Sequence, residues 1–86
     1  PEKLIYQILS IASNPGDLVL DCYLGSGSTI STAHKMGRQY IGIEINPNTI
    51  ELVKERMQAV VNGENGGISS IVSWAGGGDF KCFKAE

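Results

Sequence analysis

The spacing of apolar residues predicts that the chain begins with an amphipathic helix. Residues 2–12 carry apolar side chains at helical spacing, which indicates one buried stripe. A turn containing Pro15 and Gly16 then ends the helix, because proline presets the backbone angle φ and glycine accepts a positive φ. The members of the predicted stripe are Leu4, Ile5, Ile8, Leu9, Ile11 and Ala12.

Two more helices follow, each separated from the last by a short apolar run. The first covers residues 28–36, with Lys35 expected to face solvent, and it ends before Gly37. The second begins at the Asn46-Pro47 pair and extends to about residue 61. The residues of these helices expected to face inward are Ile30, Ala33, Met36, Ile50, Val53, Met57 and Val60.

The apolar runs between the helices predict strands. Residues 18–20 and 40–43 are largely apolar without alternation and are bounded by turn or loop residues. Such runs are typical of strands buried on both faces of a parallel sheet. Residues 18–61 therefore have the order strand, helix, strand, helix, which predicts an α/β fold.

The C-terminal part of the chain has a different composition. Glycines interrupt two strand-like runs, residues 68–74 and 80–83. We expect residues 63–86 to form a hairpin, or a loop leading into one more strand, that extends the α/β region of residues 1–62 within a single domain.

Composition excludes several classes of function. The chain has 86 residues and a net charge of −2 with scattered basic residues, which argues against a freestanding nucleic-acid-binding domain. No apolar run approaches the ~20 residues of a membrane span, and no signal peptide is present, so a cytoplasmic location is expected. Cys22 and Cys82 lie far apart and predict reduced thiols rather than a metal site. His34 is expected to be solvated, and Trp74 to serve packing.

A glycine loop between the first strand and the next helix carries the candidate chemistry. Asp21 ends the strand, and Gly25 and Gly27 precede the helix. In open parallel sheets ligands bind at the carboxyl ends of the strands, and glycine lets a ligand approach the backbone. Glu44 ends the next strand, where an acid typically binds ribose hydroxyls. The combination favours a nucleoside-type ligand over a purely structural loop.

Two features narrow the choice of nucleoside. Ile30 stands where a dinucleotide-binding loop has its third glycine, and Asp21 would repel a pyrophosphate. The chain also contains no Gly-Lys-Ser/Thr, so it has no P-loop. S-adenosylmethionine has ribose hydroxyls, an α-amino group and no phosphate, and it fits these residues best. A generic nucleotide-binding module is the weaker alternative.

Two segments resemble the cofactor-binding signature of amino-group DNA methyltransferases. They are Asp-Cys-Tyr-Leu-Gly-Ser-Gly-Ser at residues 21–28 and Gly-Arg-Gln-Tyr-Ile-Gly-Ile-Glu at residues 37–44. Residues 1–13 resemble the preceding helix of the permuted, bacterial type. The tail over residues 66–80 is similar to the modification subunit of type III restriction–modification systems. Cys22-Tyr23 replaces the usual Pro-Phe, and the loss of a rigid proline predicts weaker cofactor binding.

The resemblance implies one part of the seven-stranded, Rossmann-like sheet of an S-adenosylmethionine-dependent methyltransferase. Asp21 and the glycines would surround the methionine part of the cofactor, Glu44 would hold the ribose, and Ile45 would pack on adenine. Helix capping by Ser28 and Thr29, strand-end packing of Ile45 and core packing of Tyr23 stay open as alternatives. The implied cofactor-binding residues are Asp21, Tyr23, Gly25, Ser26, Gly27, Ser28, Thr29, Glu44 and Ile45.

The resemblance also implies the reaction and its partners. The complete enzyme would methylate the exocyclic amine of adenine in double-stranded DNA after flipping the base, and the choice of adenine over cytosine rests only on the type III resemblance. A catalytic half upstream of Pro1, a restriction subunit and a second copy of the chain are the candidate partners. The family's catalytic tetrapeptide contains adjacent prolines, which this chain lacks, so no catalytic residue is assigned and the chain alone is expected to be inactive. An inactive piece that docks or self-associates is the alternative of a different class.

Overall fold

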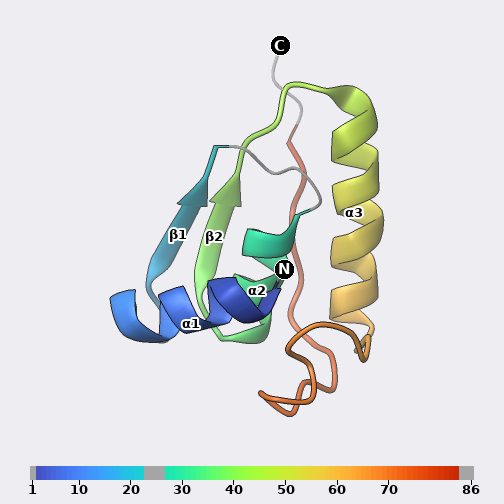
Figure 1. Ribbon diagram of the computed structural model, residues 1–86. Coiled ribbons are helices and arrows are strands. Elements are labelled where there is room, and N and C mark those ends of the chain that lie inside the picture. Colours follow the sequence, from blue (N-terminus) through green and yellow to red (C-terminus); the bar gives the residue numbers. More distant parts are fainter. Residues whose placement is uncertain (1, 23–26, 84–86) are drawn as a thin grey trace.

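The computed structural model describes residues 2–22 and 27–83, and its helices and strands follow the predicted order (Figure 1). Each predicted helix and strand up to residue 61 is present within one or two residues of its expected bounds. The elements are α1 (Glu2–Ala12), β1 (Leu18–Asp21), α2 (Ser28–Lys35), β2 (Gln39–Gly42) and α3 (Pro47–Val61).

The two strands pair in parallel. Val19 lies opposite Tyr40, and Leu20 lies opposite Ile41. Because side chains alternate along a strand, these two pairs face opposite sides of the sheet. Tyr40 packs against core residues of α2 and α3, so its face is the one covered by helices. The α/β prediction with parallel strands is confirmed.

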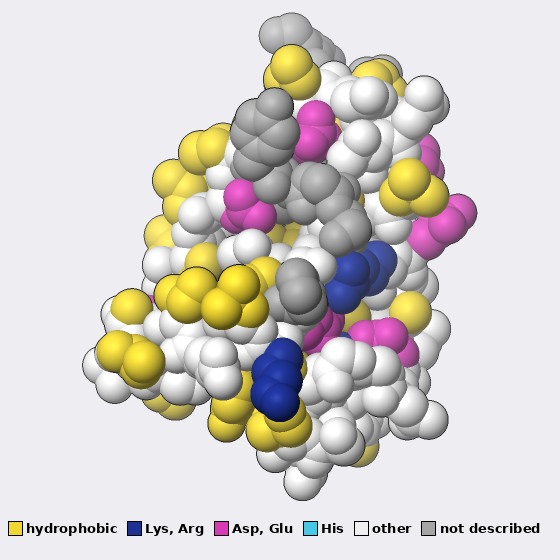
Figure 2. All heavy atoms as spheres, viewed as in Figure 1, with side chains coloured by type: hydrophobic (Ala, Val, Ile, Leu, Met, Phe, Trp, Pro, Cys, Tyr) yellow, Lys and Arg dark blue, Asp and Glu magenta, His cyan; other side chains and the backbone are white. Residues whose placement is uncertain are grey.

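The other face of the sheet is uncovered. Leu18 and Leu20 are each 60% exposed, and Ile41 and Ile43 are each 50% exposed. The prediction that the strands are buried on both faces is therefore wrong for this structure. The helices that follow the strands cover one side only, and no described element packs on the other. Figure 2 shows apolar side chains gathered on the surface of this part of the molecule.

The hydrophobic core lies between α2 and α3. Ile30 of α2 packs with Val53 and Met57 of α3, and Tyr40 and Phe80 close the cluster from β2 and the C-terminal segment. The inward positions predicted for the two helices are confirmed for these three residues and for Ala33 and Val60. Burial of large apolar side chains is the main stabilising contribution, at about 1.5–3 kcal/mol for each.

The apolar stripe of α1 is narrower than predicted. Leu9 is buried and Ile5 is half-buried, whereas Leu4, Ile8 and Ile11 are exposed. The helix packs on α2 along one seam, and its remaining apolar side chains have no described element to cover them. The predicted single buried stripe is therefore wrong, because it combines the seam with a second, outward face.

The end of α1 is held by Arg38, which precedes β2. Its guanidinium donates to the carbonyl oxygens of Leu9, Ser13 and Met36 at 2.9–3.2 Å. The last carbonyls of a helix have no partner within the helix, so a side-chain donor there stabilises its end. Arg38 thus belongs to the structural part of the signature segment.

The C-terminal segment forms turns where strands were predicted. Residues 67–73 are in turns, and residues 74–83 contain no strand. Five glycines between positions 63 and 78 adopt positive φ, which breaks an extended path. The predicted hairpin is therefore wrong for the described residues. The segment instead runs back past α2 toward the core (Figure 1), where Phe80 packs.

Candidate functional site

The predicted site residues that the structure describes gather at the carboxyl ends of the two strands. Asp21 ends β1, and Gly27 and Ser28 begin α2. The N–H of Ile43 donates to the Asp21 carbonyl at 2.9 Å, which places Glu44 beside the same sheet edge. Asp21 and Glu44 are both half-buried. Tyr23, Gly25 and Ser26 lie outside the described residues.

Gly27 occupies a position that only glycine fits well. Its φ is 81°, in the left-handed region that side chains disfavour. A Cβ added there would stand 3.3 Å from Cγ1 of Val53 on α3. The prediction assigned this glycine to close approach of a ligand, and the structure adds tight packing against α3 as a second reason.

Ser28 and Thr29 are half-buried in the first turn of α2. The N-cap position of that helix belongs to Gly27, and no side chain caps it. N-capping, the structural alternative for the two hydroxyl residues, is therefore wrong. The hydroxyl oxygen of Ser28 accepts a hydrogen bond from Nη1 of Arg56 at 3.3 Å.

Glu44 shapes the turn from β2 into α3. Its Oε2 accepts the backbone N–H groups of Ile45 and Asn46, both at 3.0 Å. Asn46 in turn caps α3 by accepting the N–H of Asn48 at 2.9 Å. The carboxylate is therefore held in one orientation at the sheet edge, while Oε1 accepts no hydrogen bond from the described residues.

Ile45 projects away from the packed part of the molecule. Its side chain is 93% exposed, so strand-end packing, the structural alternative for this residue, is wrong. An exposed branched apolar side chain next to Glu44 is available to cover a planar ring. Ile45 and Glu44 are adjacent in the chain and together border the candidate site.

A buried carboxylate lies beside the first turn of α2 and was not predicted. Glu2 is 4% exposed and accepts hydrogen bonds from Ser31, Lys35, Arg56 and the N–H of Ile68. Burial alone would raise its pKa, but these four donors together lower the pKa from 4.5 to about 2. Glu2 is therefore ionised at neutral pH.

Lys35 is the main correction within α2. It was expected to face solvent, yet its side chain is fully buried and donates to Glu2 at 2.9 Å and to Glu64 at 2.5 Å. A lysine is tolerated there because two carboxylates and the Gly66 carbonyl receive its three donors. No local signal in the sequence marks this burial, because Glu2 and Glu64 are distant along the chain.

His34 is also packed rather than solvated. Its Nε2 lies 2.8 Å from the Gly77 carbonyl, and Nδ1 lies 2.7 Å from Oη of Tyr40. Because a carbonyl only accepts, Nε2 donates to Gly77, which in the tautomer with one ring proton leaves Nδ1 to accept from the Tyr40 hydroxyl. Burial, aided by the charge of Asp79, raises the pKa of Tyr40 to about 12, so the phenol keeps its proton.

Trp74 completes this cluster as a packing residue, as predicted. Its ring meets His34 edge-on, with ring centres 5.3 Å apart, and its Nε1 donates to the Val60 carbonyl at 2.7 Å.

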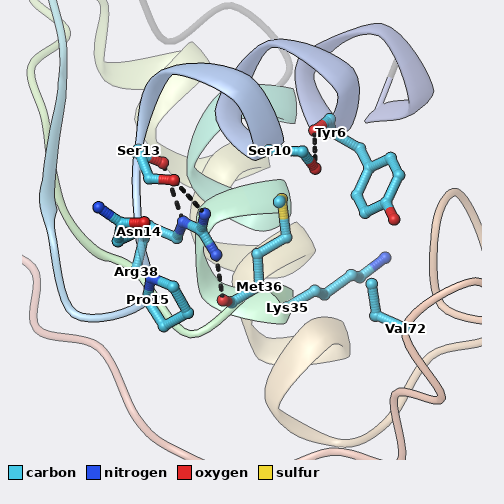
Figure 3. Close-up of a pocket in the computed structure, with 9 residues that line it drawn as sticks. All are labelled: Tyr6, Ser10, Ser13, Asn14, Pro15, Lys35, Met36, Arg38 and Val72. Carbon is cyan, nitrogen blue, oxygen red and sulfur yellow. Dashed lines mark hydrogen bonds between the residues drawn. The ribbon is translucent and has the colours of Figure 1, made fainter.

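A hollow of about 420 Å³ lies at the opposite end of the sheet (Figure 3). It is bordered by the end of α1, the loop before β1 and the end of α2. Among its polar groups, the Arg38 guanidinium donates to backbone carbonyls and to Ser13, and Lys35 is engaged with Glu2 and Glu64. Both basic side chains of the hollow are therefore engaged within the fold.

Neither a metal centre nor a membrane-spanning helix is found in the described part of the chain. No group of three or more His, Cys, Asp or Glu side chains in residues 2–22 and 27–83 is arranged to hold a metal ion. None of the described helices combines the length and apolar character needed to cross a membrane. Cys22 and Cys82 are both free and exposed.

The chain is a small α/β unit with two acids and a buried glycine at one sheet edge, and comparison with known proteins identifies its family. Residues 1–55 match the model of the N6/N4 methyltransferase family, which is described as DNA methylase. This chain belongs to that family, and the resemblance found from the two signature segments is confirmed.

Relatives of known type cover most of this chain. It is 51% identical over 80 residues to the probable type III restriction–modification enzyme HindVI Mod subunit of Haemophilus influenzae, covering 93% of this chain and 11% of that protein. It is 52% identical over 46 residues to the type II methyltransferase M1.MboII of Moraxella bovis, covering 54% of this chain and 18% of that protein. The chain therefore spans less than a fifth of the length of either relative.

The fold is similar to that of a solved complex. The crystal structure of M1.HpyAVI with S-adenosylmethionine matches with a TM-score of 0.63 and 38% identity, covering 65% of this chain and 28% of that one. The small α/β unit with parallel strands thus corresponds to part of a DNA methyltransferase structure.

Proposed function

We propose that this chain binds S-adenosylmethionine and is the cofactor-binding part of a site-specific DNA methyltransferase. The observation that carries the proposal is the meeting of Asp21 and Glu44 at one sheet edge, beside the buried, positive-φ Gly27. The similarity to a methyltransferase crystallised with this cofactor supports the choice of ligand. The residues present suit the cofactor, because two carboxylates face a ligand that carries an amine and ribose hydroxyls but no phosphate.

Each described residue has a distinct role in this proposal. Asp21 accepts hydrogen bonds from the α-amino group, and Glu44 accepts from the ribose hydroxyls. Because Oε2 of Glu44 is fixed by two backbone N–H groups, little orientational freedom is lost when the ribose binds. Ile45 covers the adenine ring, and the first turn of α2 presents its backbone N–H groups.

The remaining predicted contacts complete the site. Tyr23 is proposed to form one wall of the cofactor pocket, and Gly25 to let the methionine part of the cofactor approach the backbone. Ser26 and Thr29 are proposed to form hydrogen bonds beside that methionine part. The cofactor supplies a sulfonium methyl group as the electrophile, and this chain orients it toward the catalytic half.

The whole enzyme is proposed to methylate the exocyclic amine of adenine in double-stranded DNA after flipping the base from the duplex. The choice of adenine rests on the similarity to a type III Mod subunit. In this proposal the uncovered sheet face packs in the complete seven-stranded fold, and a catalytic half and a restriction subunit are the partners in the cytoplasm.

A second candidate function is a piece that docks or self-associates without binding the cofactor. The exposed Leu18, Leu20, Ile41 and Ile43 favour it, because adjacent apolar side chains on one face tend to be covered. A generic nucleotide-binding module is disfavoured, since Ile30, at the position of the third glycine, is buried in the core.

Calorimetric titration of S-adenosylmethionine into the purified chain tests the proposal. We expect binding that Glu44→Ala weakens by roughly 1.5–3 kcal/mol, the scale of hydrogen bonds to a charged group. Glu55→Ala, at an exposed position of α3, is the matched control and should bind like the parent. No heat of binding, or equal competition by NAD, would reject the proposed ligand.

A further inference from the structure

The buried carboxylate of Glu2 joins four separate parts of the chain. It lies in the first turn of α1 and accepts from Ser31 of α2, from Arg56 of α3 at 2.9 Å and from the N–H of Ile68 at 3.0 Å. The fit is tight, because a Cβ on Gly67 would overlap Oε1 of Glu2. The Glu2 carboxylate therefore links α1 to α2, to α3 and to the C-terminal segment.

The Arg56 side chain connects the Glu2 carboxylate to the candidate site. Its Nη2 donates to Oε2 of Glu2 at 2.9 Å, and its Nη1 donates to the hydroxyl oxygen of Ser28 at 3.3 Å. The stem of the same side chain passes close to Gly27, with Cδ 3.7 Å from the position of an added Cβ. One guanidinium thus connects a buried anion with the first residue of α2.

Ser31 provides a second connection to the same turn. Its hydroxyl donates to Glu2 and also lies 3.1 Å from the carbonyl of Ser28. Its backbone N–H donates to the carbonyl of Gly27 at 2.9 Å, which forms the first turn of the helix. The turn that begins at Gly27 is therefore held from two directions, and both depend on Glu2.

We propose that Glu2 and Arg56 are positioning residues, which hold the first turn of α2 in the geometry that binds S-adenosylmethionine. This inference rests on the proposed function. A helix turn already held in place before binding loses less conformational entropy when the ligand arrives, so anchoring it raises affinity. Neither residue needs to touch the cofactor to have this effect.

The cluster divides into a part that faces the site and a part that does not. Lys35 binds Glu64 and the Gly66 carbonyl and so fastens the turn after α3. Arg56 instead donates a hydrogen bond to Ser28 at the start of α2. Its side chain is 30% exposed, whereas that of Lys35 is fully buried. Replacing Arg56 leaves Glu2 paired with Lys35, so the fold keeps a compensated buried charge.

Two measurements on the purified chain test the proposal. The first is the Kd for S-adenosylmethionine, titrated well below the Tm of each variant so that only folded protein contributes. The second is hydrogen exchange at the Ser31 amide without ligand, which reports the bond to Gly27. We expect Arg56→Met to raise the Kd and to speed exchange, each about tenfold.

Controls separate positioning from general stability. Lys54→Met removes a half-exposed cation from the same helix, where it pairs with Glu51 at 3.6 Å, and should leave the Kd and the exchange rate as in the parent. Arg56→Lys keeps the charge beside Glu2, so it folds even where Arg56→Met does not, and it should restore Tm without restoring the Kd. Glu2→Gln combined with Arg56→Met should raise the Kd less than the product of the two single effects.

The outcomes distinguish this inference from the function on which it rests. A lowered Tm with parental Kd and parental Ser31 exchange would show that Arg56 stabilises the fold only, and would overturn the inference. If the parent binds no S-adenosylmethionine, the proposed function fails. The positioning role is overturned separately if the Ser31 amide of Arg56→Lys exchanges at the same rate as in the parent. Faster exchange confined to the α2 turn supports it.

Discussion

Nε2 of His34 on α2 donates to the carbonyl of Gly77, 43 residues further along the chain, at 2.8 Å. The same ring accepts from Tyr40 and contacts Trp74, so one side chain connects α2, β2 and the C-terminal segment. The neighbouring backbone is fitted to it, because a Cβ on Gly78 would lie 2.9 Å from Nε2. His34 therefore attaches the glycine-rich segment to the α/β unit.

Replacing His34 should loosen this attachment. We expect His34→Ala to lower the free energy of unfolding by roughly 1.5–3 kcal/mol, since two hydrogen bonds and a ring contact are lost. Urea denaturation measures the change, and limited proteolysis should cut the variant within residues 74–83. Gln58→Ala, at an exposed position of α3, is the control and should change stability by less than about 0.5 kcal/mol. Equal stability of both variants would contradict the role of His34.

The ionisation of Glu2 makes stability depend on pH. Its pKa is about 2 in the folded chain, below the ordinary 4.5, so folding favours the charged form. The resulting stabilisation, of the order of 3 kcal/mol, is complete above pH 4.5 and is lost as pH falls toward 2. Denaturation between pH 7 and pH 2.5 should show this decline, and Glu2→Gln should flatten it. A decline of the same size in Glu2→Gln would assign the effect to other carboxyl groups.

The order of the elements could be predicted from the sequence, whereas the partners of individual polar residues could not. Apolar spacing is a local property, so the three helices and both strands follow from residues close together in the chain. Lys35 and His34 were placed in solvent because a helical pattern assigns polar side chains to the outer face. Their partners Glu2, Glu64 and Gly77 are distant in sequence, and only the folded chain brings them together.

The candidate site shows the same division. The positions of Asp21, Gly27 and Glu44 could be predicted because strand ends and glycine loops have local signatures. The structure brings all three residues to one edge of the sheet. The tight packing of Val53 against Gly27, which also favours glycine at this position, depends on how α3 packs and has no local signature in the sequence. Arg56 was missed for the same reason.

Two glycines allow the backbone and ligand roles of Gly27 to be separated. Gly27 and Gly16 both have positive φ, at 81° and 90°, so alanine at either position should cost about 1 kcal/mol in backbone strain, and the contact with Val53 adds to this cost at Gly27. Only Gly27 lies at the proposed site, and a Cβ at Gly16 meets no atom within 4 Å. We expect Gly27→Ala to weaken S-adenosylmethionine binding in calorimetry and Gly16→Ala to leave it unchanged. Parental affinity in Gly27→Ala would make the loop purely structural.

The uncovered sheet face should cause the purified chain to self-associate. Leu20 and Ile41 are paired across the strands and largely exposed, next to Leu18 and Ile43. We expect the mass measured by analytical ultracentrifugation to rise with concentration, because association removes this apolar surface from water. Leu20→Lys combined with Ile41→Lys should shift the chain toward monomer. Leu52→Lys, at an exposed apolar position of α3, should not, and a monomeric parent would refute the expectation.

The chain alone should not methylate DNA. The catalytic tetrapeptide of amino-group methyltransferases contains two adjacent prolines, and the prolines here, at positions 1, 15 and 47, are all separated. A net charge of −2 also provides no electrostatic attraction for the phosphate backbone. Transfer of tritium from labelled S-adenosylmethionine to bacterial DNA should therefore stay at the level of a Gly27→Val control. Incorporation above that control would mean that a catalytic group lies within this chain, whereas incorporation only when a catalytic segment is supplied in trans would support a cofactor-binding role for the 86 residues.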